Sequence, residues 1–474
     1  MKIDESEIIK VTNNRYRLNY HLMPTSGWMN DPNGFVYFKG YYHIFYQYYP
    51  YDSQWGPMHW GHARSKNLID WERLPAALVP GDKEDEDGCF SGSAIVKDDK
   101  LYLIYTGHHY YVKNDPDNFW QNQNLAFSED GINFTKYENN PIIANPPKDN
   151  TIHFRDPKVW EHNGKYYVVI GSQNQEEVGR ILMYESEDLL DWVFKGVIAE
   201  SKSSKIEGFM WECPDLFRLN GKDILLLSPQ GIESENKKYL NLFQTGYFVG
   251  QLDYDQVSYE RDKFTELDHG HDFYATQTML AQDGRRIVLG WMDMWEAKMP
   301  EQVDGWAGAL TLPRELTLVD DHLYMNPVEE VKELRTDKCV DESIKNTKYL
   351  LAKLGKKEIE LNIDSQLEDW EGNIFTFSMI QKGETKLSLT FNKDNQELIL
   401  YRHGEDPNRY ANLEKCMRLK LQIFIDRSSI ELFINDGEVV FSERIYLIDN
   451  YDISLESDSP IDMGIQGYFL KGCE

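Results

Sequence analysis

The fold is decided by a stretch that reads Phe35-Val36-Tyr37-Phe38-Lys39-Gly40-Tyr41-Tyr42-His43-Ile44-Phe45. Aromatic and β-branched runs flank a Lys-Gly turn there, and this pattern predicts a β-hairpin. Comparable stretches begin at residues 94, 158, 215 and 278, so the hairpin recurs with a period of roughly 60 residues. That period suits a four-stranded blade with long connections. The sequence therefore predicts an all-β fold that begins with a five-bladed β-propeller.

The pattern changes in the last third of the chain. Residues 327–334 have the charge and spacing of a short helix, which predicts a connector. Residues 419–426 and 429–437 then alternate apolar and polar side chains, as is typical of an antiparallel sandwich with one exposed face per sheet. We therefore predict three parts: a catalytic five-bladed β-propeller over residues 1–325, a connector over 326–340 and a β-sandwich over 341–474.

The composition excludes several classes of partner. Lys and Arg total 50 against 79 Asp and Glu, and the formal net charge of −29 opposes binding to nucleic acid and to anionic membranes. The first residues hold no apolar run, and no stretch approaches the roughly 18 apolar residues that a membrane helix needs. We therefore expect a cytoplasmic protein without a nucleic-acid or membrane partner. The charge gives no indication of its oligomeric state.

The sequence also gives no support for a metal or another cofactor. The five cysteines are scattered and lack the spacing of a zinc cage or a disulfide framework. The acidic run at 82–88 does not place its oxygens at the positions of a calcium-binding EF-hand loop. His59 and His62 have no evident third ligand nearby in the sequence. We expect a solvated loop at 82–88 and structural or binding histidines.

Three acids stand at the entries to the first, third and fourth hairpins: Asp31, Asp156 and Glu212. Taken singly, Asp31 and Asp156 could serve the structure alone. Asp31 lies in an Asp-Pro-Asn-Gly turn, and Asp156 follows Arg155, with which it could form an ion pair. In a propeller, however, the first strand of each blade lines the axis, so the three acids should converge at one mouth of the channel. Paired carboxylates in a site rich in Trp and Tyr point to glycoside chemistry, in which one acid attacks or activates water and the other protonates the leaving oxygen.

Six motifs occur in order along the propeller part. They are Trp28-Met29-Asn30-Asp31-Pro32-Asn33-Gly34, Phe45-Tyr46-Gln47, Phe90-Ser91-Gly92-Ser93, Phe154-Arg155-Asp156-Pro157, Glu212-Cys213-Pro214-Asp215 and Gly290-Trp291-Met292. Together they resemble the motif set of the β-fructofuranosidases, the invertase and sucrose-6-phosphate hydrolase family of glycoside hydrolases. Residues 425–431 extend the resemblance into the C-terminal part, so it covers nearly the whole chain.

The resemblance implies a retaining hydrolase that cleaves terminal β-D-fructofuranosides through a covalent fructosyl-enzyme, with sucrose 6-phosphate or sucrose as substrate. Asp31 would be the nucleophile, Glu212 the acid and then the base, and Asp156 a stabiliser of the transition state through fructose hydroxyls. Matches to positions that bind substrate in the family are Asn30, Gln47, Trp55, Phe90, Ser91, Arg155 and Trp291. For Trp55 and Trp291, core packing is the alternative interpretation.

Two other functions remain compatible with converging acids. Arabinanase-like propellers also bring three acids together, so the substrate could be another furanoside such as an arabinan. A protein that binds fructans without cleaving them is the alternative from a different class.

Overall fold

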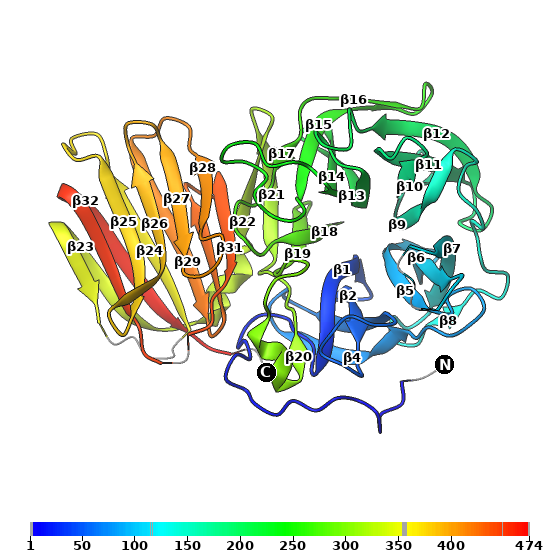
Figure 1. Cartoon of the computed structure of the whole chain (residues 1–474), viewed down its shortest axis with the longest axis horizontal. Helices are drawn as coiled ribbons and strands as arrows, with labels where there is room; N and C mark the ends of the chain where they lie inside the picture. Colours follow the sequence, from blue (N-terminus) through cyan, green and yellow to red (C-terminus); the bar gives the residue numbers. More distant parts are fainter. Residues whose placement is uncertain (1–2, 114, 116, 353–357, 448, 473–474) are drawn as a thin grey trace.

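The computed structural model describes residues 3–113, 115, 117–352, 358–447 and 449–472. Almost all of its regular structure is β-strand, and its short 3-10 helices are η1 (Pro300–Asp304) and η2 (Glu329–Leu334). Within these described ranges, no helix has the length and apolar character to cross a membrane. Figure 1 shows a ring of sheets on one side of the molecule and a layered pair of sheets on the other.

The ring consists of five sheets, which we call blades I to V. In each, four antiparallel strands run outward from the axis in sequence order (Figure 1). The first two blades are formed by β1 (Gly27–Phe38), β2 (Tyr41–Tyr49), β3 (His59–Ser65) and β4 (Trp71–Leu78), then by β5 (Gly88–Lys97), β6 (Lys100–Tyr110), β7 (Phe119–Ser128) and β8 (Thr135–Lys136). Blade III contains β9 (Asn150–His162), β10 (Lys165–Asn174), β11 (Gly179–Ser186) and β12 (Val193–Glu200).

Blade IV contains β13 (Met210–Leu219), β14 (Lys222–Gln230), β15 (Gly246–Asp253), β16 (Ser258–Arg261) and β17 (Thr265–Glu266). Blade V contains β18 (Tyr274–Leu280), β19 (Arg286–Trp291), β21 (Arg314–Val319) and β22 (His322–Pro327). β20 (Trp306–Ala307) lies between β19 and β21 in the chain and pairs in parallel with β1 of blade I. The five predicted hairpins are the two inner strands of the five blades, so the predicted propeller is confirmed.

The C-terminal part is the predicted β-sandwich. Its strands are β23 (Arg335–Leu351), β24 (Ile359–Gln366), β25 (Ile374–Gln381), β26 (Glu384–Asn392), β27 (Glu397–Arg402), β28 (Asn408–Asn412), β29 (Arg418–Asp426), β30 (Ser429–Ile434), β31 (Val439–Arg444) and β32 (Asp452–Leu470). The long β32 pairs with β25 through its first half and with β24 through its second half. One strand therefore continues across both halves of the sandwich and joins them through a single hydrogen-bonded path.

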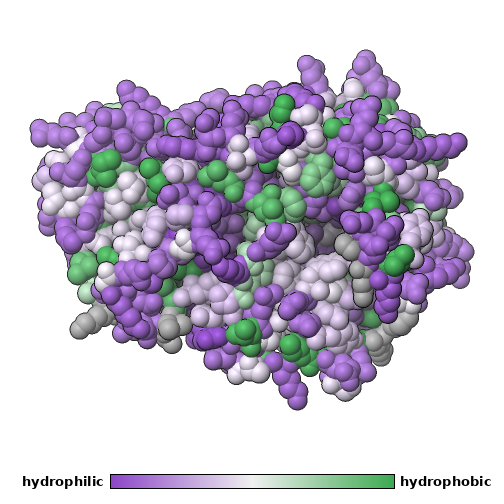
Figure 2. Space-filling view, in the orientation of Figure 1, coloured by the Kyte–Doolittle hydropathy of each residue, from purple (hydrophilic) through white to green (hydrophobic). Residues whose placement is uncertain are grey.

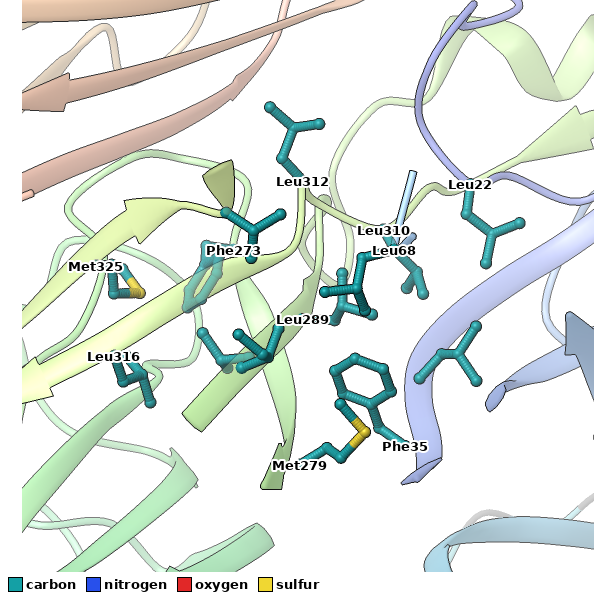
Figure 3. Close-up of a cluster of buried hydrophobic side chains, with 14 of the residues drawn as sticks. Leu22, Phe35, Leu68, Phe273, Met279, Leu289, Leu310, Leu312, Leu316 and Met325 are labelled. Carbon is teal, nitrogen blue, oxygen red and sulfur yellow. The ribbon is translucent and has the colours of Figure 1, made fainter. Parts of the chain in front are cut away.

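The propeller and the sandwich share one core. A cluster of buried side chains contains Phe273, Leu312 and Met325, which lie in or next to blade V (Figure 3), and continues into Phe424 and Phe433 of the sandwich. Because apolar burial stabilises in proportion to the area removed from water, this shared core holds the two parts as one unit.

Buried charges reinforce that junction. The Glu431 carboxylate accepts a hydrogen bond from Arg314 Nη2 of blade V at 2.5 Å, and its other oxygen lies 2.7 Å from Nε2 of His21. The other ring nitrogen of His21 lies 2.9 Å from Asp426 Oδ2. All four side chains are fully buried. The motif at 425–431 therefore contributes to the junction between the two parts.

Candidate active site

The innermost strand pair of every blade has an irregularity at the same level. The register shifts lie between Met29 and Pro32, Phe90 and Gly92, Arg155 and Lys158, Glu212 and Asp215, and Tyr274 and Thr276. β-Bulges of this kind redirect side chains and are common beside active sites. Asp31, Asp156 and Glu212 all lie in or directly beside these bulges. They belong to β1, β9 and β13, which are inner strands of the ring (Figure 1).

Glu212 does not occupy the same register position as Asp156. Arg155 pairs with Gly171, and Glu212 pairs with Ser228. Gly171 and Ser228 stand at the same distance beyond their hairpin turns, so Glu212 is the counterpart of Arg155. The counterpart of Asp156 is Cys213. The repeat therefore brings the acids to one level of the channel, while a one-residue offset separates their positions in the bulge.

The Asp31 carboxylate accepts hydrogen bonds through both of its oxygens. Oδ2 accepts a hydrogen bond from Ser91 Oγ of blade II at 2.6 Å, and Oδ1 accepts one from Asn30 Nδ2 at 3.0 Å. Asn30 is itself fixed by Trp28, whose Nε1 donates to Asn30 Oδ1 at 2.7 Å. Burial raises the pKa of Asp31, the hydrogen bond from Ser91 lowers it, and the charge of Glu212 raises it further, with a net shift upward.

Glu212 is held through both of its oxygens. Oε1 accepts a hydrogen bond from Arg155 Nε of blade III at 2.9 Å, while Oε2 accepts from Tyr274 Oη of blade V at 2.5 Å and from Gln230 Nε2 at 2.9 Å. The guanidinium of Arg155 also lies 2.8 Å from Nδ1 of His153. Because a guanidinium only donates, this imidazole nitrogen must be an acceptor. Three blades therefore determine the place of one carboxylate.

Asp156 completes the acid cluster. Its Oδ2 accepts the backbone N–H of Cys213 at 2.9 Å. The Cys213 thiol lies 3.6 Å from the same oxygen and 3.5 Å from Asp31 Oδ2, so it sits between the two carboxylates. Burial, and then the negative charge of Glu212, raise the pKa of Asp156. The three acids that the repeat singled out thus converge, and they form one electrostatic unit.

The other predicted site residues lie around this cluster. Gln47 is buried, and its Nε2 donates to the carbonyl of Cys89 at 3.1 Å. Phe90 stacks on His108 with ring centroids 4.2 Å apart. The rings of Phe90 and Trp55 form a T-shaped pair with centroids 5.9 Å apart. Trp55 is 40% exposed, which places it where a ligand could reach it. Figure 2 shows the surface hollowed over the middle of the propeller.

Trp291 has a different setting from Trp55. It is fully buried, and its ring lies 5.1 Å from Trp295 and 5.8 Å from Trp28. Its Nε1–H has no hydrogen-bond partner among the described residues. Since Trp28 holds Asn30, the packing of Trp291 supports the Asp31 side of the site from behind.

Several residues of the site were absent from the sequence prediction. Tyr274 and Gln230 both contact Glu212, and His153 contacts Arg155. Tyr274 had a detectable signal, because it stands at the entry to the fifth hairpin, as Glu212 does at the fourth. Gln230 and His153 lie outside the matching positions, so the repeat could not identify them.

The acidic run at 82–88 is organised around a lysine. Lys136 Nζ donates to Asp82 Oδ2 at 2.8 Å and to Asp85 Oδ1 at 3.0 Å. Asp85 is fully buried, so the loop is anchored here and is less solvated than expected. His62 Nε2 lies 3.0 Å from His43 Nδ1, whereas Nδ1 of His59 lies 3.0 Å from the carbonyl oxygen of Pro57. In the part of the chain that the structure describes, no three potential ligands group together as a metal site.

Comparisons with known proteins show the family to which the chain belongs. The model of the glycosyl hydrolases family 32 N-terminal domain matches residues 21–327, and that of the family's C-terminal domain matches residues 330–461. A sucrose-6-phosphate hydrolase of Zymomonas mobilis is 41% identical over 90% of this chain and 86% of its own length. A raffinose invertase of Escherichia coli is 43% identical over 90% of this chain and 89% of its own.

A solved structure extends the comparison to the fold. The Bombyx mori beta-fructofuranosidase of this family superposes with a TM-score of 0.88 at 42% identity, covering 99% of this chain and 96% of that one. A variant of that enzyme was solved in complex with sucrose. The motifs, the propeller with its sandwich and these matches lead to one conclusion. The chain belongs to glycoside hydrolase family 32.

Proposed function

We propose that the protein is a β-fructofuranosidase that hydrolyses terminal β-D-fructofuranosides with retention of configuration. The observation that carries this proposal is the convergence of Asp31, Asp156 and Glu212 at the axis of the propeller, with Asp31 and Asp156 on either side of one thiol. Retaining glycosidases need one carboxylate as nucleophile and a second carboxyl group as acid and base. A third acid is then available to bind the hydroxyls of the sugar.

In the first step, the Asp31 carboxylate attacks the anomeric carbon of the fructosyl unit. The bond to the leaving oxygen breaks, and Glu212 delivers a proton to that oxygen. In the second step, Glu212 takes a proton from water, and the resulting hydroxide attacks the same carbon and releases Asp31. Fructose leaves with its configuration retained, and both carboxyl groups return to their starting states.

The surroundings of each acid suit these roles. The hydroxyl of Ser91 and the amide of Asn30 donate to Asp31 and favour its ionised form. Tyr274, Gln230 and Arg155 fix the orientation of Glu212, which must face the leaving oxygen. We assign the recognition of fructose to Asp156, Asn30, Gln47, Phe90, Ser91, Arg155 and Trp55. Trp291, which is fully buried, would shape the fructose pocket through its packing against Trp28.

Sucrose 6-phosphate is the proposed preferred substrate, with sucrose as a second one. Support comes from relatives named sucrose-6-phosphate hydrolase in Zymomonas mobilis, Escherichia coli and Bacillus subtilis, at 38–42% identity. A cytoplasmic location is a prediction that goes with a phosphorylated substrate.

The deciding experiment compares kcat/KM for sucrose 6-phosphate, sucrose, raffinose and a fructan. We expect the highest value for sucrose 6-phosphate. Equal values for the phosphorylated and the free disaccharide would contradict the substrate preference. Binding of all four without turnover would contradict hydrolysis itself. Turnover of nitrophenyl arabinosides in place of fructosides would identify a different glycosidase.

A further inference from the structure

The bulges of three blades share an unusual backbone conformation. Asp156, Cys213 and Ala275 have φ values of 65°, 48° and 46°, which lie in the left-handed region that side chains other than glycine rarely adopt. These residues are counterparts in blades III, IV and V. A bulge removes a residue from its strand ladder, so its N–H needs another partner. The acceptor of this N–H in each blade therefore determines how the bulge is fixed.

In two of these blades the partner is a hydroxyl of the preceding blade. The N–H of Asp156 donates to Thr106 Oγ1 at 3.0 Å, and the N–H of Ala275 donates to Ser228 Oγ at 3.2 Å. Thr106 and Ser228 hold corresponding places, because each pairs with the residue just before its own blade's bulge. The propeller thus uses one device twice, at the junctions of blades II with III and IV with V.

The junction between blades III and IV lacks that hydroxyl. The corresponding position is Gly171, and a Cβ atom there would lie 2.1 Å from the carbonyl oxygen of Trp211, so no side chain fits. The N–H of Cys213 donates to the Asp156 carboxylate instead, at 2.9 Å. Asp156 therefore replaces the missing hydroxyl. Its own backbone N–H donates to Thr106, and its carboxylate accepts the N–H of Cys213.

Two glutamines complete the support of Asp156. Gln121 Oε1 accepts the N–H of Phe154 at 3.0 Å, and Gln123 Nε2 donates to the carbonyl of Phe154 at 2.9 Å. Thr106 Oγ1 donates to Gln123 Oε1 at 3.0 Å, so its hydroxyl both donates and accepts. Gln121, Gln123 and Thr106 are all buried, at 3%, 0% and 0% exposure. Blade II thus fixes the backbone of blade III on both sides of Arg155.

We propose that Thr106, supported by Gln123, is a positioning residue for Asp156. The inference rests on the proposed role of Asp156 in binding fructose hydroxyls. By holding the bulge, Thr106 aims one carboxylate oxygen at the N–H of Cys213. The other oxygen, Oδ1, meets no donor among the described residues and is left for the sugar. Without the hydroxyl, the bulge can relax and the carboxylate leaves its place.

The test replaces Thr106 by the isosteric valine. We expect T106V to lower kcat/KM by about 10- to 100-fold, because displacing a binding group by about 1 Å costs a factor of this size. The loss should be the same for sucrose and for methyl β-D-fructofuranoside, since both present the same fructosyl unit. T106S keeps the hydroxyl and should stay within about threefold of the parent protein.

The matched control is Ser93→Ala, at the same junction of blades. Ser93 Oγ donates to the carbonyl of Pro157 at 2.7 Å and accepts the N–H of Val159 at 2.9 Å, so its loss removes two comparable bonds beyond the bulge. S93A should lower Tm and keep kcat/KM within about threefold. Equal losses of activity in S93A and T106V would show general loosening and overturn the proposal.

Three further outcomes decide the remaining cases. If T106V has a lower Tm but the activity of the parent, Thr106 is structural only. If T106V does not fold, Q123M tests the same support, with the same expected loss and the same refutation. If the parent protein itself cleaves no β-fructofuranoside, the proposed function fails, whereas an active parent with an active T106V removes only this inference.

Discussion

Replacing Ser91 by alanine tests how the site keeps its nucleophile ionised. Asp31 is buried and lies near Glu212, and both conditions raise its pKa. The 2.6 Å hydrogen bond from Ser91 Oγ opposes them, because it stabilises the carboxylate. A hydrogen bond to a charged group contributes about 1.5–3 kcal/mol, and about 1.4 kcal/mol corresponds to one pKa unit. Losing it should therefore raise the pKa of Asp31 further, because the ionised form loses a stabilising donor while burial and the charge of Glu212 remain.

The assay is the pH dependence of kcat/KM for sucrose, whose acid limb reports the ionisation of the free enzyme. A nucleophile must be deprotonated, so activity is lost as the pH falls through the pKa of Asp31. In S91A this limb should move to higher pH. S91T, which keeps a hydroxyl, should retain the limb of the parent protein. A uniform loss of rate in S91A with an unmoved limb would refute the reasoning and assign Ser91 to substrate binding alone.

The remaining predictions concern the other acids and the junction between the two parts. D31A should abolish turnover with little change in Tm, because its role is chemical; substantial residual activity would contradict the assignment. E212Q should slow substrates with poor leaving groups most, and an equal loss for all leaving groups would argue against it as the acid. Burial lowers the pKa of His21, but its hydrogen bonds to two carboxylates outweigh this effect and raise the pKa to about 9. The protonated ring therefore stabilises the fold fully below the ordinary pKa near 6.5, and this stabilisation is lost as the pH rises through about 9. The free energy of unfolding of the parent protein should therefore fall by on the order of 3 kcal/mol between pH 6 and pH 10, as measured by urea titration, and H21Q should lack this decrease. An equal decrease in the parent protein and in H21Q would contradict the prediction.

The hairpins and the acids were accessible from the sequence because both are local features that repeat. Strand–turn–strand patterns carry their own signal, and Asp31 stands just ahead of the first of them. The partners that hold the acids come from other blades, so spacing along the chain does not reveal them. Tyr274 meets Glu212 across 62 residues and His21 meets Glu431 across 410. The domain limits at 325 and 340 stay predictions.

Contacts across blade junctions explain why the acids need a closed ring. Ser91 of blade II holds Asp31 of blade I, and Arg155 of blade III holds Glu212 of blade IV. Beneath them, Lys158 Nζ of blade III lies 2.8 Å from Asp215 Oδ2 of blade IV and 2.8 Å from the carbonyl of Thr278 in blade V.

A blade that shifted by a fraction of an ångström would thus move the donor of its neighbour's acid. Separating a buried ion pair costs the protein several kcal/mol of stability, so the Lys158–Asp215 pair opposes such a shift between blades III and IV. The site is therefore a property of the junctions between blades. Substitutions of the junction residues that hold the acids, such as Ser91 and Arg155, should affect catalysis more strongly than equally destabilising ones in the outer strands.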